Sequence, residues 1–186
     1  FDIVCLAVPI PATSEVIADF ADRTEQAMVD LAGYMAGPLE AMREHVPDLE
    51  RASLHPLFAA ENAPGNVAAI AENEGPAVAV IRDALTSRGN DWVETDAETH
   101  DEAMETVQAS AHAAVLAYAL AGDDVREEFH TPISGPLTAL AERVASGDPA
   151  VYAEIQQAFD GTGAVADAAR RLTDADAGEF EALYRR

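Results

Sequence analysis

The sequence contains no lysine, and its 11 basic residues are all arginine. Acidic residues number 34, so the formal net charge is -23 over 186 residues. A surface that binds the phosphates of nucleic acid needs clustered basic side chains, and so does a surface that binds anionic lipids. The composition therefore argues against both nucleic acid and membranes as partners.

Cysteine and long apolar runs are also scarce. Cys5 is the single cysteine, which excludes a disulfide framework and a cysteine-based zinc site. No segment approaches the roughly 20 apolar residues of a membrane helix. The apolar run at residues 3–10 is too short for such a helix and lacks the basic flank of a signal peptide. The chain opens with Phe1 rather than Met, so we expect an upstream part to be missing.

The excess of acidic residues, the absence of lysine and the abundance of alanine are together typical of proteins from salt-accumulating archaea. Carboxylates hold water and cations while concentrated salt screens their mutual repulsion. We therefore expect a halophilic, cytoplasmic protein whose charge reflects its solvent. A specific cation-binding function is the alternative.

Strand and helix signals alternate up to about residue 95 and predict a parallel α/β sheet. The expected strands are residues 1–10, 27–31, 51–57, 66–71 and 91–94, and the helices begin near Thr13, Gly37 and Pro76. From residue 96 onward only helical runs follow, at 98–121, 136–146, 149–159, 164–172 and 175–184. The sequence thus predicts an α/β domain at 1–95 and an all-helical domain at 96–186.

The first helix of the second domain is apolar on more than one face between residues 109 and 120. A helix of this kind is buried all round. In a helical unit of about 90 residues such burial points to a subunit interface. We therefore expect a homodimer through the C-terminal half, because closed two-fold dimers are the commonest oligomers.

Two histidines and one arginine could carry chemistry. His55 ends a predicted strand, and ligands of open α/β sheets bind outside the carboxyl ends of strands. His112 lies in the apolar helix, and Arg143 has the planar fork that suits a carboxylate. The alternatives are a histidine bonded at a strand end, a core histidine and an ordinary ion pair. His100 and Asp101, at a helix start, are typical of capping and dipole compensation.

Several familiar motifs are absent from the sequence: the His-Glu-x-x-His zinc motif, the Gly-x-Ser-x-Gly elbow, the Walker loop and Gly-x-Gly-x-x-Gly. Other segments form a recognisable series instead. In chain order they are Val29 to Met35, Ser53-Leu54-His55-Pro56-Leu57-Phe58, Asp96-Ala97-Glu98-Thr99-His100-Asp101, Ala111-His112-Ala113, and Arg143 to Pro149 followed by Tyr152. Their order and spacing resemble the prephenate and arogenate dehydrogenase family, in its haloarchaeal form, over nearly the whole chain.

The resemblance implies a concrete activity. It implies the C-terminal part of a Rossmann-like domain, a helical dimerisation and substrate domain, and NAD(P)-dependent oxidative decarboxylation of prephenate or arogenate in tyrosine biosynthesis. His55 would draw the proton from the ring hydroxyl, and Arg143 would bind a substrate carboxylate. His112, Tyr152 and Glu61 would line the substrate pocket. Val8, Pro9 and Gly33 would lie against NAD or NADP.

Two departures from the family pattern leave alternatives open. Gly33 stands where the family has a serine that contacts its catalytic histidine, and Met35 stands where it has a lysine. The Gly-rich part of the Rossmann domain is not in the sequence. We therefore expect weak binding of the cofactor by this chain alone. A non-catalytic dimeric ligand-binding or regulatory relative is the first alternative. A hydroxy-acid dehydrogenase is the second, although such enzymes commonly use a lysine.

Overall fold

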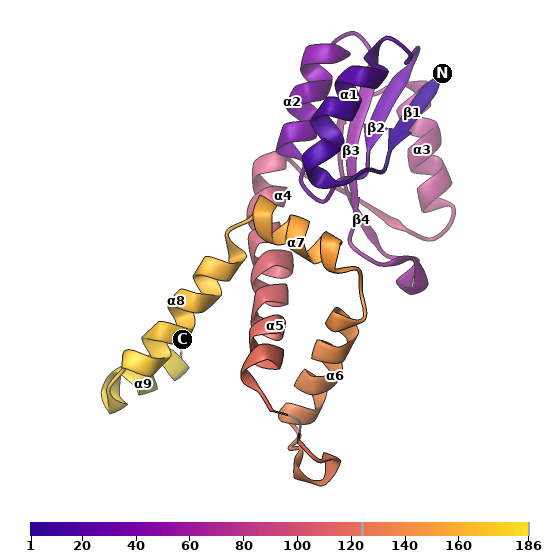
Figure 1. The fold of residues 1–186 in the computed structure, drawn as a ribbon. Coiled ribbons are helices and arrows are strands. Elements are labelled where there is room, and N and C mark those ends of the chain that lie inside the picture. The colour runs from indigo at the N-terminus through magenta and orange to yellow at the C-terminus, as the bar shows by residue number, and fades with distance from the viewer. Residues whose placement is uncertain (124, 186) are drawn as a thin grey trace. The chain divides into compact units, whose positions relative to one another are not determined.

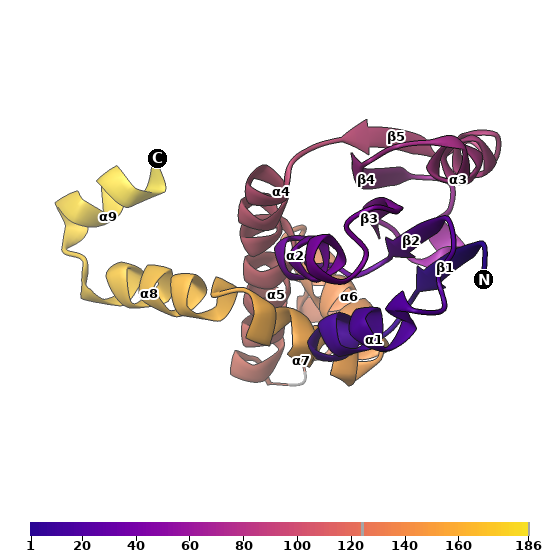
Figure 2. The ribbon, with the colours of Figure 1, turned by 90° about the horizontal axis from the view of Figure 1, so that it is seen from above.

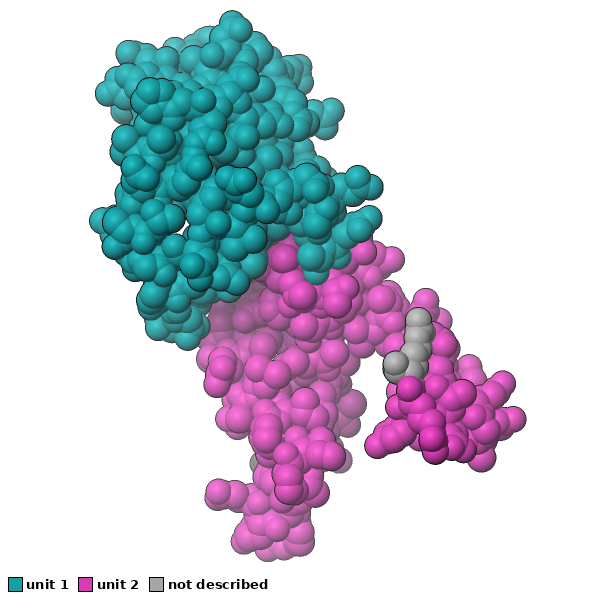
Figure 3. Space-filling view, turned by 180° about the vertical axis from the view of Figure 1, so that it is seen from behind, with its two compact units in different colours: residues 1–103 teal, residues 104–186 magenta. Residues whose placement is uncertain are grey.

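The structure is a computed structural model that describes residues 1–123 and 125–185. The chain divides into two compact units, residues 1–103 and residues 104–186, coloured separately in Figure 3. The sequence predicted this boundary at residue 95. It falls later because the helix that begins at Ala97 bonds to the sheet and to a helix of the first unit.

The first unit is an α/β layer structure around one five-stranded sheet (Figures 1 and 2). The strands lie side by side in chain order: β1 (Ile3–Leu6), β2 (Ala27–Asp30), β3 (Glu50–Pro56), β4 (Asn66–Glu72) and β5 (Asp91–Glu94). The helices are α1 (Thr13–Ala21), α2 (Ala36–His45), α3 (Pro76–Thr86) and α4 (Ala97–Met104). All five strands expected from the sequence are thus confirmed, within a few residues at their ends.

Three of the four strand pairs are parallel, and the expectation of a wholly parallel sheet is wrong at one place. β3 and β4 pair antiparallel, with Arg51 opposite Glu72. Only residues 57–65 join these two strands, and a parallel crossover needs a dozen or more residues. The Nε of Arg51 donates to Glu72 Oε2 at 3.0 Å, so an ion pair fixes this register.

Both faces of the sheet are covered. α1 and α2 pack on one face, where the buried cluster includes Val4, Met28, Leu39 and Met42. α3 packs on the other face, with Val29, Leu54, Val67 and Val78 among its buried neighbours. Figure 2 shows the helices on their two sides. Burial on both faces explains why the strands read as continuous apolar runs rather than as alternating ones.

α1 begins at Thr13, as predicted, but without a side-chain cap. The Thr13 hydroxyl donates instead to the Pro9 carbonyl at 3.2 Å. A single turn of 3₁₀ helix at Ile10–Ala12 leads directly into α1. Because the chain enters the helix already coiled, no side chain caps α1.

The second unit is built of helices: η3 (Glu105–Ser110), α5 (Ala111–Ala121), α6 (Ser134–Ala145), α7 (Pro149–Ala158), α8 (Gly161–Asp174) and α9 (Ala177–Tyr184). No strand occurs in its described residues. α7 starts as predicted, since the Asp148 side chain accepts from the Ala150 backbone N–H at 2.9 Å. None of the described helices is long and apolar enough to cross a bilayer.

The long helix expected at 98–121 is continuous but not uniform. It runs from α4 through η3, a π-helical segment, into α5. Gly161, at the start of α8, lies against η3 so closely that an added Cβ would stand 2.3 Å from the backbone of Ala109 and Ser110. The Gln156 side chain donates to the Ala109 carbonyl at 2.8 Å. The Ala109 carbonyl, which in an uninterrupted α-helix accepts only from the helix backbone, thus accepts from a side chain of α7.

Within the single chain, most of α5 is exposed. Ala113 is its one buried residue, and Leu120 is 87% exposed. The sequence predicts that a partner subunit buries this apolar helix, and that interface stays a prediction.

Candidate active site

The carboxyl ends of three parallel strands meet at one edge of the first unit's sheet. Leu6, Asp30 and Ser53 stand at the same level in β1, β2 and β3. The segments that leave this edge carry Val8 and Pro9 after β1 and Gly33 after β2. His55 lies two residues beyond Ser53, near the end of β3. The structure therefore places the predicted cofactor-binding residues and the predicted catalytic histidine at one edge.

His55 is buried in β3, with 7% of its surface exposed. Its Nδ1 lies 3.0 Å from Nε2 of His100, which is 3% exposed. The two rings meet edge to face at a centroid distance of 5.2 Å. The neighbour of His55 is thus a second histidine from α4, 45 residues further along the chain.

His100 in turn contacts a carboxylate. Its Nδ1 lies 2.8 Å from Asp101 Oδ1. The backbone N–H groups of Met35 and Ala36 donate to Oδ1 and Oδ2 of Asp101, each at 3.1 Å. Because no side chain of its own segment caps α2, Asp101 caps that helix from α4. An anion is favoured at a helix N-terminus, so the Asp101 side chain and the N-terminus of α2 stabilise one another.

Burial is the main reason that the pKa of His55 falls to about 4, well below that of an exposed histidine. The neighbouring His100 lowers the pKa further, and the Asp101 charge partly opposes both effects. Near neutral pH His55 is therefore an uncharged imidazole. An uncharged imidazole can accept a proton from a hydroxyl group, which is what a general base must do.

Asp30 is a second buried titratable group at this edge. Its Oδ1 accepts from the Ala32 backbone N–H at 2.9 Å, and Oδ2 has no hydrogen-bond partner in the described part of the chain. Burial raises the pKa of Asp30 to about 7, with the Ala32 amide and the Ser53 side chain acting against the rise. Asp30 therefore titrates near neutral pH, one strand away from His55.

Two of the predicted substrate-binding residues meet in the second unit. The rings of His112, in α5, and Tyr152, in α7, contact edge to face at 4.8 Å. Burial lowers the pKa of His112, whose Nδ1 is buried without a hydrogen-bond partner among the described residues. Tyr152 also lines a cavity of about 300 Å³ between α5, α6 and α7. Burial thus favours the uncharged form of this half-buried imidazole.

Arg143 and Glu61 are both exposed. Arg143 lies in the last turn of α6, and none of the described acidic side chains is within ion-pair distance of it. Glu61 lies in a 3₁₀ turn (Ala60–Asn62) within the connection from β3 to β4. The structure therefore leaves the Arg143 guanidinium available to a ligand and places Glu61 on the surface beyond the His55 strand.

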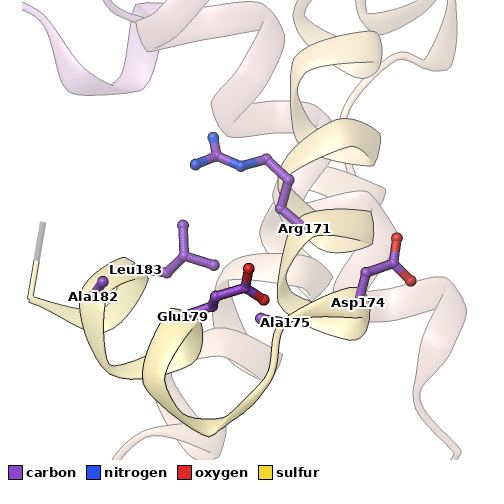
Figure 4. A pocket seen from close by; sticks show the side chains of 6 residues that line it. All are labelled: Arg171, Asp174, Ala175, Glu179, Ala182 and Leu183. Atoms are coloured by element: carbon purple, nitrogen blue, oxygen red, sulfur yellow. The ribbon is translucent and has the colours of Figure 1, made fainter.

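Another cavity of the second unit lies between α8 and α9. It has a volume of about 650 Å³ and is lined by Arg171, Asp174, Ala175, Glu179, Ala182 and Leu183. Figure 4 shows charged and apolar side chains mixed around it. None of its lining residues was singled out in the sequence, and none belongs to the histidine cluster. No group of three metal-binding side chains occurs among the residues described.

Sequence reasoning missed His100, Asp101 and Asp30 as parts of the site. The sequence predicts that the pair at 100–101 caps its own helix, but Asp96 performs that role by accepting from the Thr99 backbone and hydroxyl. Asp30 could have been found, because a lone acid at the end of an apolar strand indicates a site. The contact between His55 and His100 could not, since it joins segments far apart in the chain.

No protein-family model matches the chain. Over 182 residues it is 32% identical to a 4-amino-4-deoxyprephenate dehydrogenase of Streptomyces pristinaespiralis, covering 91% of this chain and 61% of that protein. Over 173 residues it is 30% identical to a T-protein of Enterobacter agglomerans, covering 82% of this chain and 43% of that protein. The chain thus spans less than two thirds of the length of either relative.

Solved structures identify the fold. Prephenate dehydrogenase from Aquifex aeolicus matches 99% of this chain with a TM-score of 0.71 at 13% identity, over 74% of its own chain. Synechocystis arogenate dehydrogenase matches 99% of this chain with a TM-score of 0.57 at 15% identity, over 76% of its own chain. The α/β fold followed by a helical region, as expected from the sequence, is therefore confirmed.

Proposed function

We propose that this chain contains the catalytic part of an NAD(P)-dependent dehydrogenase that oxidatively decarboxylates prephenate or arogenate. The observation that carries the proposal is the buried, uncharged His55 at the carboxyl edge of the sheet, bonded through His100 to Asp101. The alignment with the Streptomyces relative supports it, because it extends over 91% of the chain.

In this proposal His55 takes the proton of the substrate's ring hydroxyl while hydride leaves the carbon that bears that hydroxyl. The ring carboxylate then departs as carbon dioxide, and its bonding electrons complete an aromatic ring. Accepting the hydride is the chemistry that a bound nicotinamide supplies. His55 is suited to its part because its pKa of about 4 leaves it unprotonated at neutral pH.

The residues at the sheet edge fit one end of a dinucleotide. Val8, Pro9 and Gly33 offer a small, largely apolar surface that suits the flat nicotinamide ring. A pyrophosphate needs backbone N–H groups at a helix N-terminus, and those of α2 are bonded to Asp101. This chain therefore fits the nicotinamide end of NAD or NADP and offers the phosphates little, so we expect it to bind the cofactor weakly by itself.

Substrate binding is assigned to residues that remain predictions. We propose that Arg143 binds a substrate carboxylate and that His112, Tyr152 and Glu61 contribute to the substrate pocket. Arg143 is the most informative of these, because a dianionic substrate needs a local cation in a protein of charge -23. Its exposure and the absence of an ion pair among the described residues support the role.

We further propose a cytoplasmic, halophilic homodimer that pairs through the helical domain. Exposed apolar side chains in that domain support pairing, since Leu120, Ile133 and Tyr184 are each more than 70% exposed. Isolated domains seldom expose so many large apolar side chains without a partner surface. The acidic, lysine-free composition supports adaptation to salt.

A substrate with an amine in place of the ring hydroxyl is the second candidate. The name of the Streptomyces relative, 4-amino-4-deoxyprephenate dehydrogenase, supports it. A non-catalytic relative is the third, because Gly33 cannot supply a side-chain hydroxyl. The first two candidates share the hydride transfer and differ in the group that His55 faces.

A turnover assay on the full-length gene product tests the proposal. Prephenate, arogenate and 4-amino-4-deoxyprephenate are each incubated with NAD+ or NADP+ in concentrated potassium chloride, and reduced cofactor is followed by absorbance. Turnover with any of the three establishes a dehydrogenase, and the ratio of kcat/KM values identifies the substrate. A folded protein that binds cofactor and turns over none of the three substrates would overturn the proposal and favour a non-catalytic relative.

In the same assay Arg143→Ala tests substrate binding. We expect it to raise KM strongly while kcat changes less, because a carboxylate contact contributes binding in both ground and transition states. Arg170→Ala is the matched control, since Arg170 is exposed in α8 and pairs with Asp167 at 2.7 Å. Unchanged kinetics for Arg143→Ala would remove this residue from the site.

A further inference from the structure

The cluster of Asp101, His100 and His55 forms one directional chain of hydrogen bonds. Asp101 accepts from two backbone N–H groups and holds the Nδ1 of His100 at 2.8 Å. His100 Nε2 lies 3.0 Å from His55 Nδ1. A carboxylate can only accept, so the proton of its bond to His100 belongs to Nδ1 of that histidine.

The direction of the first bond sets the others. A neutral His100 with its proton on Nδ1 has a lone pair on Nε2, which can accept from Nδ1–H of His55. A neutral imidazole carries one proton, so His55 Nε2 is then the nitrogen with the lone pair. His55 is only 7% exposed, and burial disfavours its charged imidazolium form.

We propose that His100 and Asp101 are positioning residues that hold His55 in the tautomer with its proton on Nδ1. In this tautomer Nε2 is the nitrogen that accepts the substrate's proton, so the inference rests on the proposed function for its catalytic consequence. A carboxylate that holds a catalytic imidazole in one tautomer is the arrangement of the serine protease triad. Here a second histidine stands between the carboxylate and the base.

A structural role of the same residues is the competing explanation. Asp101 ties α4 to the N-terminus of α2, and removing it would loosen both helices whatever the tautomer of His55. The test therefore needs a readout that a simple loss of packing leaves unchanged. The ¹⁵N chemical shifts of a histidine provide it, because a protonated ring nitrogen and one with a lone pair resonate far apart.

Nitrogen-15 spectra of histidine-labelled protein at pH 7 give the first arm, with His55 assigned by the signal lost in His55→Asn. We expect the protonated nitrogen of His55 in the unmodified protein to be Nδ1. In Asp101→Asn the new amide can donate to His100 Nδ1, so the proton of His100 moves to its Nε2. His100 Nε2 then donates to His55 Nδ1, which must carry the lone pair. We therefore expect the protonated nitrogen of His55 to become Nε2 in that variant.

Asp96→Asn is the matched control, since it removes the same charge from the start of the same helix without touching His100. We expect it to leave the His55 tautomer unchanged. His100→Phe removes the acceptor altogether, so both His55 tautomers should appear. Should Asp101→Asn fail to fold, His100→Phe and the spectrum of the unmodified protein still decide. A His55 proton on Nε2 in the unmodified protein, or a tautomer indifferent to both substitutions, would overturn the inference.

The second arm is kinetic. We expect Asp101→Asn to lower kcat about 10- to 100-fold with little change in KM, as outer partners of other functional histidines do. Asp96→Asn should keep the kcat of the unmodified enzyme. If the unmodified protein has no dehydrogenase turnover, the proposed function fails while the spectra still test the tautomer. If turnover is normal and Asp101→Asn has normal kcat, the positioning role alone fails.

Discussion

At the scale of single residues, burial shifts the pKa values of two side chains at one sheet edge in opposite directions. His55 has its pKa lowered to about 4, so its burial stabilises the fold above pH 6.5 and that stability is lost as the pH falls toward 4. Asp30 has its pKa raised to about 7, so its burial costs stability as the pH rises from about 4 to 7. The unfolding free energy changes over these pH ranges by roughly 3 kcal/mol through His55 and by roughly 4 kcal/mol through Asp30. The two effects largely offset one another.

Protonation of the proposed base, His55, sets the acid limb of the pH dependence of catalysis. Because the unprotonated imidazole is the base, kcat/KM should stay level from pH 7 down to about 5 and fall below that. A histidine of ordinary pKa would instead make the rate fall near pH 6.5. Initial rates between pH 4.5 and 8, with circular dichroism at each pH, provide the measurement. An acid limb centred near pH 6.5 in folded protein would contradict the burial of His55.

The cost of ionising Asp30 is tested by Asp30→Asn. An amide keeps an oxygen for the Ala32 N–H and does not ionise. We expect this variant to gain stability relative to the unmodified protein as the pH rises from 4 to 8, by up to roughly 4 kcal/mol. Urea unfolding at several pH values measures the difference, with the exposed Asp19→Asn as control. An unfolding free energy that changes equally with pH in all three proteins would show that Asp30 has an ordinary pKa.

The residues of the site differed in how far the sequence could reveal them. His55 was found because a proline after a strand marks the carboxyl edge where ligands bind. His100 and Asp101 were noticed but interpreted as a local cap. Capping is set by which N–H groups lie within reach, and those of Met35 and Ala36 reach Asp101 only after α4 docks beside α2.

At the scale of elements, nearly every strand and helix was predictable, and so were the three parallel strand pairs, but the antiparallel pairing of β3 with β4 was not. Strand direction between β3 and β4 depends on the length of the connection, and residues 57–65 are too few for a helical crossover. The π-helical segment within the expected long helix had no sequence signal either. It depends on contacts from Gln156 and Gly161, about 50 residues away.

The fit of α8 against η3 gives a prediction for Gly161→Ala. The added methyl group would meet backbone atoms of Ala109 and Ser110, which cannot rotate away as a side chain could. We expect a loss of about 1–3 kcal/mol in unfolding free energy, or more if η3 is displaced. Gly163→Ala, in the same helix, is the control, since its methyl group would meet only the movable Asp160 side chain. Equal stability of the two variants by denaturant unfolding would contradict the close contact.

At the scale of the whole molecule, charge is the dominant feature. Eleven arginines cannot neutralise 34 carboxylates, so most acidic side chains repel one another across the surface. Salt shortens the range of this repulsion from about 10 Å at 0.1 M to about 3 Å at 1 M. The composition was readable from the sequence at once, and we propose that it reflects adaptation to salt rather than the chemistry of the site.

The dependence on salt is measurable. We expect the thermal midpoint to rise steeply between 0.1 M and 2 M potassium chloride. Changing the exposed Asp19, Asp22 and Glu44 to their amides should raise the midpoint at low salt and flatten this rise, because fewer charges remain to be screened. Sucrose at matched concentrations controls for general stabilisation by cosolutes. A midpoint that salt leaves unchanged would show that the acidic surface is not under electrostatic strain.

His55 is proposed above as the base of a dehydrogenation. The most direct measurement is kcat for the full-length gene product and for its His55→Asn variant, with the substrate that turns over best and saturating cofactor. We predict that kcat falls by about 10²- to 10⁴-fold, the usual contribution of a positioned base, while KM and the thermal midpoint change little. A variant that turns over at the rate of the unmodified enzyme would contradict the account.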